Sequence, residues 1–287
     1  DFVNSTPNSV SQAERAQGAV TLVTADYNLN LQTDILTPTG HFENIRHGRY
    51  RCHEPENDLF PDESIHSIAI GDVDANGSWD LLMATDSGIH LSLTDNQPGE
   101  KTWVTSSSVV SKIPTQGVLT WDCNNDGLTD LVGWGPSGVY FQQGLGDGRF
   151  NAVVHPTGVP AGPVTQCKIG DLDDDGDLDI AIIANNTPLV IQNNGGNQNN
   201  WLRLRLCAEP GPFFQVQRCN AYGVGSRIEL FSGGTYQQQI ATGQVIHFGI
   251  GQQTQADAMR VLWTNGIPQS AVQPATRVTI TEKQELL

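Results

Sequence analysis

Lysine and long apolar runs are scarce in this 287-residue chain, and each shortage excludes a class of protein. Only four lysines occur, and 15 basic residues against 31 acidic ones give a formal charge of −16. So acidic a chain is poorly suited to bind the phosphate backbone of a nucleic acid. Apolar runs such as Ile180 to Ala184 are far shorter than the ~20 residues of a membrane-spanning helix. We therefore expect no nucleic-acid partner and no transmembrane segment.

Helical patterning is also missing. We find no long stretch with apolar residues at i, i+3, i+4 and i+7, whereas short β-branched runs alternate with Gly, Asn, Asp and Pro. This pattern predicts an all-β fold, and the length suits one large domain or two ordinary ones. The chain begins at Asp1 without methionine, so we expect that a leader was removed or that the chain belongs to a longer polypeptide.

Cysteine is too rare for a disulfide scaffold, since the chain has five, and no CxxC or Cys/His spacing typical of zinc occurs. Cys207 and Cys219 flank a Pro-Gly-Pro segment, which favours a local disulfide over two buried thiols. Cys123 and Cys167 fall in predicted inner strands, and we expect both to be buried thiols.

What the chain does contain is a repeat of Asp-rich segments. Segments beginning at residues 26, 72, 122 and 171 align on one pattern, with spacings of 46, 50 and 49 residues. That period suits a four-stranded propeller blade. Oxygen-bearing residues recur at positions 1, 3, 5 and 9, and glycine stands at position 6 in all but the first segment.

Side-chain oxygens at positions 1, 3, 5 and 9 of a tight loop can surround one cation, and position 7 can add a carbonyl. Six to eight oxygens in flexible geometry suit Ca²⁺. We expect three calcium sites and a fourth, weaker one at 26–34, where Leu31 replaces the glycine. The candidate ligands are Asp72, Asp74, Asn76 and Asp80; Asp122, Asn124, Asp126 and Asp130; Asp171, Asp173, Asp175, Asp177 and Asp179; and Asp26, Asn28, Asn30 and Asp34.

Two other interpretations of the repeat fail. An EF-hand needs Glu at position 12, where this chain has Met83, Gly133 or Ile182, and its flanks should be helices rather than strands. Solvated turns that bind nothing are the second alternative, but three near-copies at one period argue against it.

The pattern resembles the FG-GAP/VCBS repeats of integrin-like β-propellers, in which a calcium loop joins the first two strands of a blade. The resemblance implies a small, four-bladed propeller over residues 1–196, with strands near 117–121, 130–134, 138–143 and 149–154 in its third blade. The fourth blade lacks an outer strand after 188–193, and we expect Phe2 to Thr6 to supply it and close the ring. The alternative is an arc of a larger propeller.

A second domain is predicted over residues 197–287, after a Gly/Asn-rich linker. Strands with period-2 alternation indicate a β-sandwich. The blocks Asn200-Trp201-Leu202, Gly223-Val224-Gly225, His247 to Gly251 and Arg260 to Trp263 resemble the ASPIC/UnbV domain of cartilage acidic proteins and bacterial TPR-linked proteins. The resemblance implies an extracytoplasmic binding or assembly module, and it supplies no catalytic residue.

No catalytic constellation is recognisable. We interpret His247 as a hydrogen-bonded structural residue, and Trp79, Trp121 and Trp134 as packing between blades rather than as sugar platforms. The residues from Arg46 to His53 form the one basic cluster, in a stretch (41–64) that we expect to be irregular. This cluster either grips an acidic partner or is a solvated blade edge.

We therefore predict a non-enzymatic, calcium-binding interaction, adhesion or assembly module located outside the cytoplasm. Its partner would be a protein or carbohydrate at the cell envelope, and the chain could form part of a larger assembly. Two alternatives remain: a propeller enzyme acting on carbohydrate, of lyase or dehydratase type, and a carbohydrate-binding lectin.

Overall fold

The computed structural model describes residues 21–46, 48–53, 59–95, 103–207, 220–277 and 279–283. These residues form 21 strands in six sheets, with no α-helix among them and one short 3₁₀ turn at Gly196–Gln198. The expected all-β fold is thus confirmed. Within the same ranges, no helical segment is long and apolar enough to cross a bilayer.

Four antiparallel sheets, each built from consecutive strands, make up the first part of the chain. Sheet one contains β1 (Val23–Ala25), β2 (Asp34–Thr37), β3 (Gly40–Asn44) and β4 (Tyr50–His53); sheet two contains β5 (Ile65–Gly71), β6 (Asp80–Thr85), β7 (Ile89–Asp95) and β8 (Trp103–Ser111). Sheet three contains β9 (Gly117–Trp121), β10 (Asp130–Gly135) and β11 (Gly138–Gln142); sheet four contains β12 (Val164–Gly170), β13 (Asp179–Ala184) and β14 (Thr187–Ile191).

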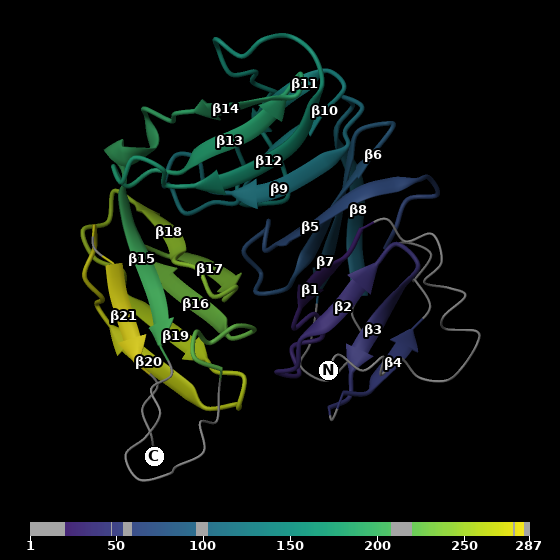
Figure 1. Ribbon diagram of the computed structural model, residues 1–287. Coiled ribbons are helices and arrows are strands. Elements are labelled where there is room, and N and C mark those ends of the chain that lie inside the picture. Colours follow the sequence, from purple (N-terminus) through teal and green to yellow (C-terminus); the bar gives the residue numbers. More distant parts are fainter. Residues whose placement is uncertain are drawn as a thin grey trace.

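The four sheets follow one another along an arc, and the remaining two sheets lie on its inner side (Figure 1). Successive sheets touch through their first strands, β1 with β5, β5 with β9, and β9 with β12. This is the arrangement of propeller blades around an axis. The closing strand expected at Phe2 to Thr6 lies outside the described residues, so the four-bladed closed ring stays a prediction.

Two details of the expected blades were wrong. The run 149–154 forms only isolated bridges, Gly144 with Phe150 and Phe141 with Val154. Within this run the carbonyl of Asn151 accepts a hydrogen bond from the side chain of Gln142 at 2.9 Å, so a side chain stands where a continuous ladder would have a backbone N–H. The stretch 41–64, expected to be irregular, contains the hairpin β3–β4, in which Phe42 pairs with Cys52.

The two ends of each blade are built differently. The Asp-rich loops join β1 to β2, β5 to β6, β9 to β10 and β12 to β13, whereas short turns join the second strand of each blade to the third. Because neighbouring strands are antiparallel, these short turns lie at the opposite end of the blade from the Asp-rich loops. The turn at Asn185 and Asn186 has φ of 50° and 61°, the type I′ geometry that matches strand twist.

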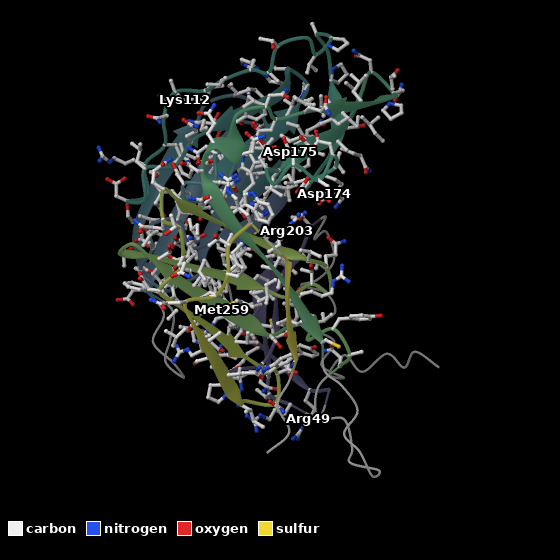
Figure 2. All side chains as sticks on the ribbon, turned by 90° about the vertical axis from the view of Figure 1, so that its left-hand side faces the viewer. Arg49, Lys112, Asp174, Asp175, Arg203 and Met259 are labelled. Atoms are coloured by element: carbon white, nitrogen blue, oxygen red, sulfur yellow. The ribbon has the colours of Figure 1, made fainter. Side chains whose placement is uncertain are left out.

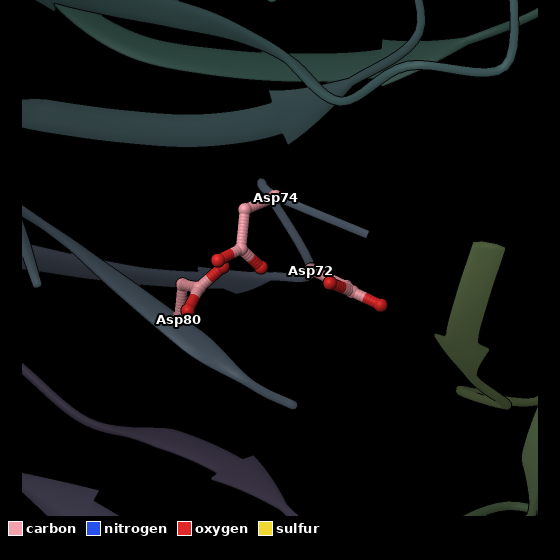
Figure 3. A group of neighbouring side chains, drawn as sticks. All are labelled: Asp72, Asp74 and Asp80. Carbon is pink, nitrogen blue, oxygen red and sulfur yellow. The ribbon is translucent and has the colours of Figure 1, made fainter. Parts of the chain in front are cut away.

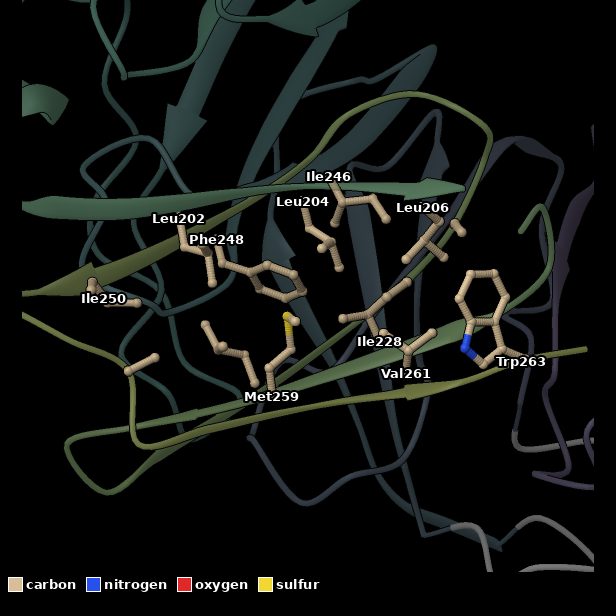
Figure 4. Close-up of a cluster of buried hydrophobic side chains, with 13 residues drawn as sticks. Leu202, Leu204, Leu206, Ile228, Ile246, Phe248, Ile250, Met259, Val261 and Trp263 are labelled. Carbon is tan, nitrogen blue, oxygen red and sulfur yellow. The ribbon is translucent and has the colours of Figure 1, made fainter. Parts of the chain in front are cut away.

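The last two sheets pack face to face. One has the order β18 (Ile246–Gly251), β15 (Asn200–Cys207) and β21 (Thr279–Lys283), and the other β17 (Thr235–Ile240), β16 (Arg227–Ser232), β19 (Ala258–Leu262) and β20 (Pro268–Val272). Alternate side chains of both sheets, including Leu204, Phe248 and Met259, fill the space between them (Figure 4). This is the β-sandwich expected from the period-2 pattern. The boundary at residue 196/197 stays a prediction.

The local disulfide expected between Cys207 and Cys219 stays a prediction, because Cys219 lies outside the described residues. None of the described cysteines is bonded to another described cysteine. Cys167 is buried as expected, and burial raises the pKa of its thiol to about 12. Cys123 is half-buried, and its thiol pKa is likewise raised, chiefly by burial. Neither thiol therefore has the depressed pKa of a reactive cysteine.

Candidate metal centre

The four Asp-rich loops share one backbone conformation. We name them by their first residue: loop 26 (26–34), loop 72 (72–80), loop 122 (122–130) and loop 171 (171–179). Position 4 has a left-handed φ in all of them: Leu29 56°, Ala75 57°, Asn125 57° and Asp174 63°. Position 6 does too, at 67° to 97°, and Leu31 occupies it without glycine in loop 26. The decayed repeat therefore keeps the loop shape at the cost of strain in two leucines.

The aspartate at position 1 holds the loop closed. Asp72 accepts hydrogen bonds from the backbone N–H groups of Asn76 and Gly77, both at 3.0 Å. Asp122 accepts the equivalent bonds from Asp126 and Gly127, at 3.2 and 2.9 Å. The carboxylate thus turns the loop around itself, with its oxygens facing the loop centre.

The aspartate at position 9 connects the loop to the end of the third strand. Asp80 accepts the N–H of Val73 at 2.7 Å through one oxygen and the N–H of Thr94 at 2.8 Å through the other. Asp130 and Asp179 do the same, each with the residue at position 2 and a residue fourteen positions further along the chain. Sequence reasoning assigned these aspartates only as metal ligands and missed their structural role.

Asp80→Asn should expose that role directly. The amide would present N–H groups to at least one of the two backbone donors, leaving a buried N–H unpaired, so we expect the free energy of unfolding to fall by about 1–3 kcal/mol. Denaturant unfolding in chelator measures the change without a contribution from metal. Asp86→Asn removes the same charge from an exposed turn and serves as the control. Equal effects of the two substitutions would contradict a structural role for Asp80.

The structure brings some of the predicted ligands together and not others. Carboxylate oxygens of Asp72, Asp74 and Asp80 lie within 4.8 Å of one another (Figure 3), as do those of Asp171, Asp173 and Asp179. In the part of the chain that the structure describes, no further group of three acidic, His or Cys residues is as tight. In loop 122, Asn124 bonds to Asp126 at 2.9 Å, and the carboxylates stay further apart.

Burial and mutual repulsion disfavour the ionised form of the loop carboxylates and so raise their pKa values. Burial raises the pKa of Asp72 to about 7 and that of Asp80 to about 8, and Asp74 adds repulsion to both. Burial also raises the pKa of Asp122 well above its usual range and that of Asp130 to about 6. Bringing a divalent cation to the loops would reverse these shifts, because an opposite charge favours the ionised form.

The donor set fits a hard cation. The converging atoms of loops 72 and 171 are carboxylate oxygens, the ligands that Ca²⁺ prefers. In loop 171, the Oδ1 atoms of Asp171 and Asp177 are buried without a hydrogen-bond partner. Loops 72 and 171 could therefore hold a metal ion.

Loop 26 departs from the other three. Its position 9 residue, Asp34, accepts the N–H of Asn44 at 2.7 Å, but its second oxygen contacts His41 Nε2 at 3.0 Å instead of a backbone N–H. Asn28 donates to Glu43 at 3.3 Å. Its remaining acid, Asp26, has its pKa raised to about 6, with burial the main cause. The predicted weak site thus has the loop shape with few charges.

The β-sandwich covers the side of the arc on which these loops lie, which no sequence pattern indicated. Gly225 lies against Thr33 of loop 26, and Gln238 donates to the carbonyl of Ser78 in loop 72 at 3.1 Å. The N–H of Gly251 donates to the carbonyl of Asn125 in loop 122 at 2.7 Å. In loop 171, Arg203 donates to Asp171 at 2.9 Å.

His247 belongs to this interface, as a structural residue. Its Nε2 lies 2.6 Å from Oδ1 of Asn125, whose amide already donates to the carbonyls of Gly176 and Gly196. The imidazole must therefore donate from Nε2. Burial lowers the pKa of His247 to about 4, and the charge of Arg203 adds to the shift, so the ring is neutral at physiological pH.

A cavity of about 1080 Å³ lies between the first strands of the blades and the sandwich. Polar groups contribute much of its wall, among them Thr120, Thr129, Gln237, Gln239 and Arg205. Trp79 and Trp121 also line this cavity, but both side chains are buried in hydrophobic clusters of the blades and leave little ring surface for a sugar to stack on.

Two family models match segments of the chain, one in the blades and one in the sandwich. The model of the FG-GAP-like repeat matches residues 122–182, which contain loops 122 and 171, and the model named ASPIC and UnbV matches residues 216–286. No curated protein matches the chain.

Among solved structures, an Agrocybe aegerita lectin that recognises non-reducing terminal N-acetylglucosamine is 20% identical. The alignment includes 61% of this chain and 49% of the lectin chain, at a TM-score of 0.47. A biofilm matrix protein of V. cholerae is 11% identical and covers 88% of this chain and 48% of its own, at a TM-score of 0.39. The chain thus spans about half the length of these two proteins.

Proposed function

Because the chain joins an FG-GAP-like repeat to an ASPIC and UnbV domain, we propose that it is a non-enzymatic, calcium-binding interaction module that acts outside the cytoplasm. Domains of these two kinds suggest an adhesion or interaction role. The converging carboxylates of loops 72 and 171 are the observation that supports calcium. No acid–base pair or nucleophile was recognised in the sequence, which favours binding over catalysis.

Calorimetric titration of the chelator-treated chain with CaCl₂ tests the metal. We expect binding at loops 72, 122 and 171, and weaker binding of MgCl₂, because Mg²⁺ demands a stricter octahedron. Asp74→Ala should remove one site, and Asp86→Ala, on an exposed turn of the same blade, should remove none. A titration without heat above that of dilution would overturn the calcium function.

The surface that meets a partner has to lie away from the metal loops, because the sandwich covers them. The hairpin β3–β4 is the strongest candidate, since Arg46, Arg49 and Arg51 are all exposed on it. Arg51 forms an ion pair with Glu43 at 3.4 Å, and Arg46 shapes the turn with a φ of 69°. On a chain of charge −16, these arginines form a local positive patch that suits a carboxylate-bearing partner.

Retention on immobilised polygalacturonate, with unmodified agarose as reference, tests that patch. The wild type should be retained at low salt and released at high salt, because salt screens exposed charges. The triple variant Arg46→Ala, Arg49→Ala, Arg51→Ala should lose retention while its calcium stoichiometry and melting temperature stay unchanged. Retention of the triple variant equal to that of the wild type would move the contact surface elsewhere.

Carbohydrate binding in the interior is the second candidate, and the polar cavity of about 1080 Å³ favours it. Its hydroxyl, amide and guanidinium groups suit the hydroxyls of a sugar. Titration with galacturonic acid oligomers, comparing the wild type with Gln237→Leu, distinguishes this cavity from the exposed hairpin.

A further inference from the structure

Loop 171 differs from the others because a cation of the chain itself is already bound to it. Arg203, on β15 of the sandwich, donates from one terminal nitrogen to Oδ2 of Asp171 and to Oδ1 of Asp174, both at 2.9 Å. Figure 2 shows Arg203 close to Asp174 on the loop. Only 17% of the Arg203 side chain and 6% of that of Asp171 are exposed. The pair is therefore largely shielded from solvent.

The guanidinium is also fixed from the other side. Its carbon lies 4.6 Å from the centre of the Trp201 ring, in a cation–π contact. Trp201 in turn lies so close to Gly176 of loop 171 that a Cβ there would come within 2.0 Å of the indole nitrogen. Trp201 and Arg203 of β15 thus contact loop 171 together, and the Arg203 side chain is held in place by the indole.

Loops 72 and 122 meet the sandwich without losing a carboxylate oxygen. Gln238 bonds to the carbonyl of Ser78 at position 7 of loop 72, which keeps a second lone pair for a metal. Gly251 and Asn199 bond to backbone carbonyls of loop 122. His247 contacts the amide of Asn125, which is not a predicted ligand. Among the described contacts, only loop 171 gives a position 1 carboxylate to a basic side chain of the sandwich.

From this difference we propose that Arg203 is a built-in cation that competes with the metal at loop 171. Arg203 takes Oδ2 of Asp171 and leaves Oδ1 free, so its positive charge stands beside the ion and repels it, and metal occupancy there weakens the docking of β15. This inference rests on the proposed calcium function. It also reverses a simple expectation from charge: the loop with the most carboxylates binds calcium more weakly than loop 72.

The test isolates loop 171 by removing ligands from the other two. In an Asp74→Ala, Asp126→Ala background, calorimetry with CaCl₂ reports loop 171, with only the weak site expected at loop 26 beside it. Arg203→Gln should raise its calcium association constant about tenfold or more, since a positive charge close to the ion has been removed. Arg205→Gln removes the same charge two residues along β15, from an arginine with no such contact to loop 171. It should change the constant less than threefold.

A second variant and a second readout guard against misfolding. Arg203→Met keeps the aliphatic stem against Trp201 and should reproduce the gain in affinity. In chelator, Arg203→Gln should melt several degrees below Arg205→Gln, because Asp171 loses its counter-charge, whereas saturating CaCl₂ should bring the two melting temperatures together.

Three results would overturn the proposal: equal gains from Arg203→Gln and Arg205→Gln, a loss of affinity in either Arg203 variant, or no binding at loop 171 in any variant. None of these results would contradict the proposed calcium function, because calcium binding at loops 72 and 122 of the wild-type chain tests that function independently.

Discussion

Excess chelator should lower the melting temperature of the protein by about 15 °C at pH 7.5. A ligand that binds only the folded loops stabilises by ~2.7 kcal/mol per site at a hundred times its dissociation constant, so three sites supply ~8 kcal/mol. For a chain of this size, 1 kcal/mol corresponds to roughly 2 °C. The three ions would also change the formal charge from −16 to −10, which reduces self-repulsion. Differential scanning calorimetry with and without chelator measures the shift.

Adding CaCl₂ back should restore the higher melting temperature, and an equal concentration of MgCl₂ should restore it only in part. This reversal separates loss of the ion from damage by the chelator. A melting curve that does not move in chelator would show that calcium has no structural role in these loops.

The metal-free protein should become less stable as the pH rises from 5 to 8, by about 10 °C in melting temperature. The folded-state pKa is about 7 for Asp72 and about 8 for Asp80, above the ordinary value of 3.8. In that pH range the unfolded chain is ionised, while the folded loops keep their protons. For each of these aspartates, every pH unit between 5 and its folded-state pKa therefore removes up to ~1.4 kcal/mol of stability.

One group acts in the opposite direction. His247 has its folded-state pKa lowered to about 4, from an ordinary value of 6.5, so its contribution to stability is lost as the pH falls below 6.5. The two carboxylates have the larger effect. Between pH 5 and 8, Asp72 and Asp80 together lose stability over more pH units than His247 gains it. Melting in chelator at pH 5, 6, 7 and 8 gives the slope.

Saturating CaCl₂ should flatten that slope above pH 6, because the ion takes over the neutralisation that protons supply. Asp80→Asn should also flatten it in chelator, whatever it does to the absolute melting temperature. A metal-free protein that gained stability up to pH 8 would contradict the raised pKa values of both aspartates.

The local structure of the loops could be predicted from the sequence because the information there is local. Position 6 needs a left-handed φ, so glycine marks it at Gly77, Gly127 and Gly176. The oxygens that close each loop belong to residues within nine positions of one another. The strands on either side follow the same register, and β6 and β13 begin at Asp80 and Asp179 as the spacing indicates.

What the sequence could not indicate depends on contacts between distant residues. The bond from Gln238 to Ser78 joins residues 160 positions apart, and that from His247 to Asn125 spans 122. No periodicity encodes such pairs. The hairpin β3–β4 was missed for another reason: its charged residues resemble a solvated loop, although Phe42 and Cys52 pair across it.

The short turns at the other end of the blades have a practical consequence. They lie away from both the metal loops and the sandwich, and Asn185 and Asn186 are exposed there. The chain should therefore tolerate inserted sequence between these two residues, and an affinity tag or fluorescent reporter placed there would leave the metal loops untouched. A protein fused at this turn would lie on the side of the blades opposite the sandwich.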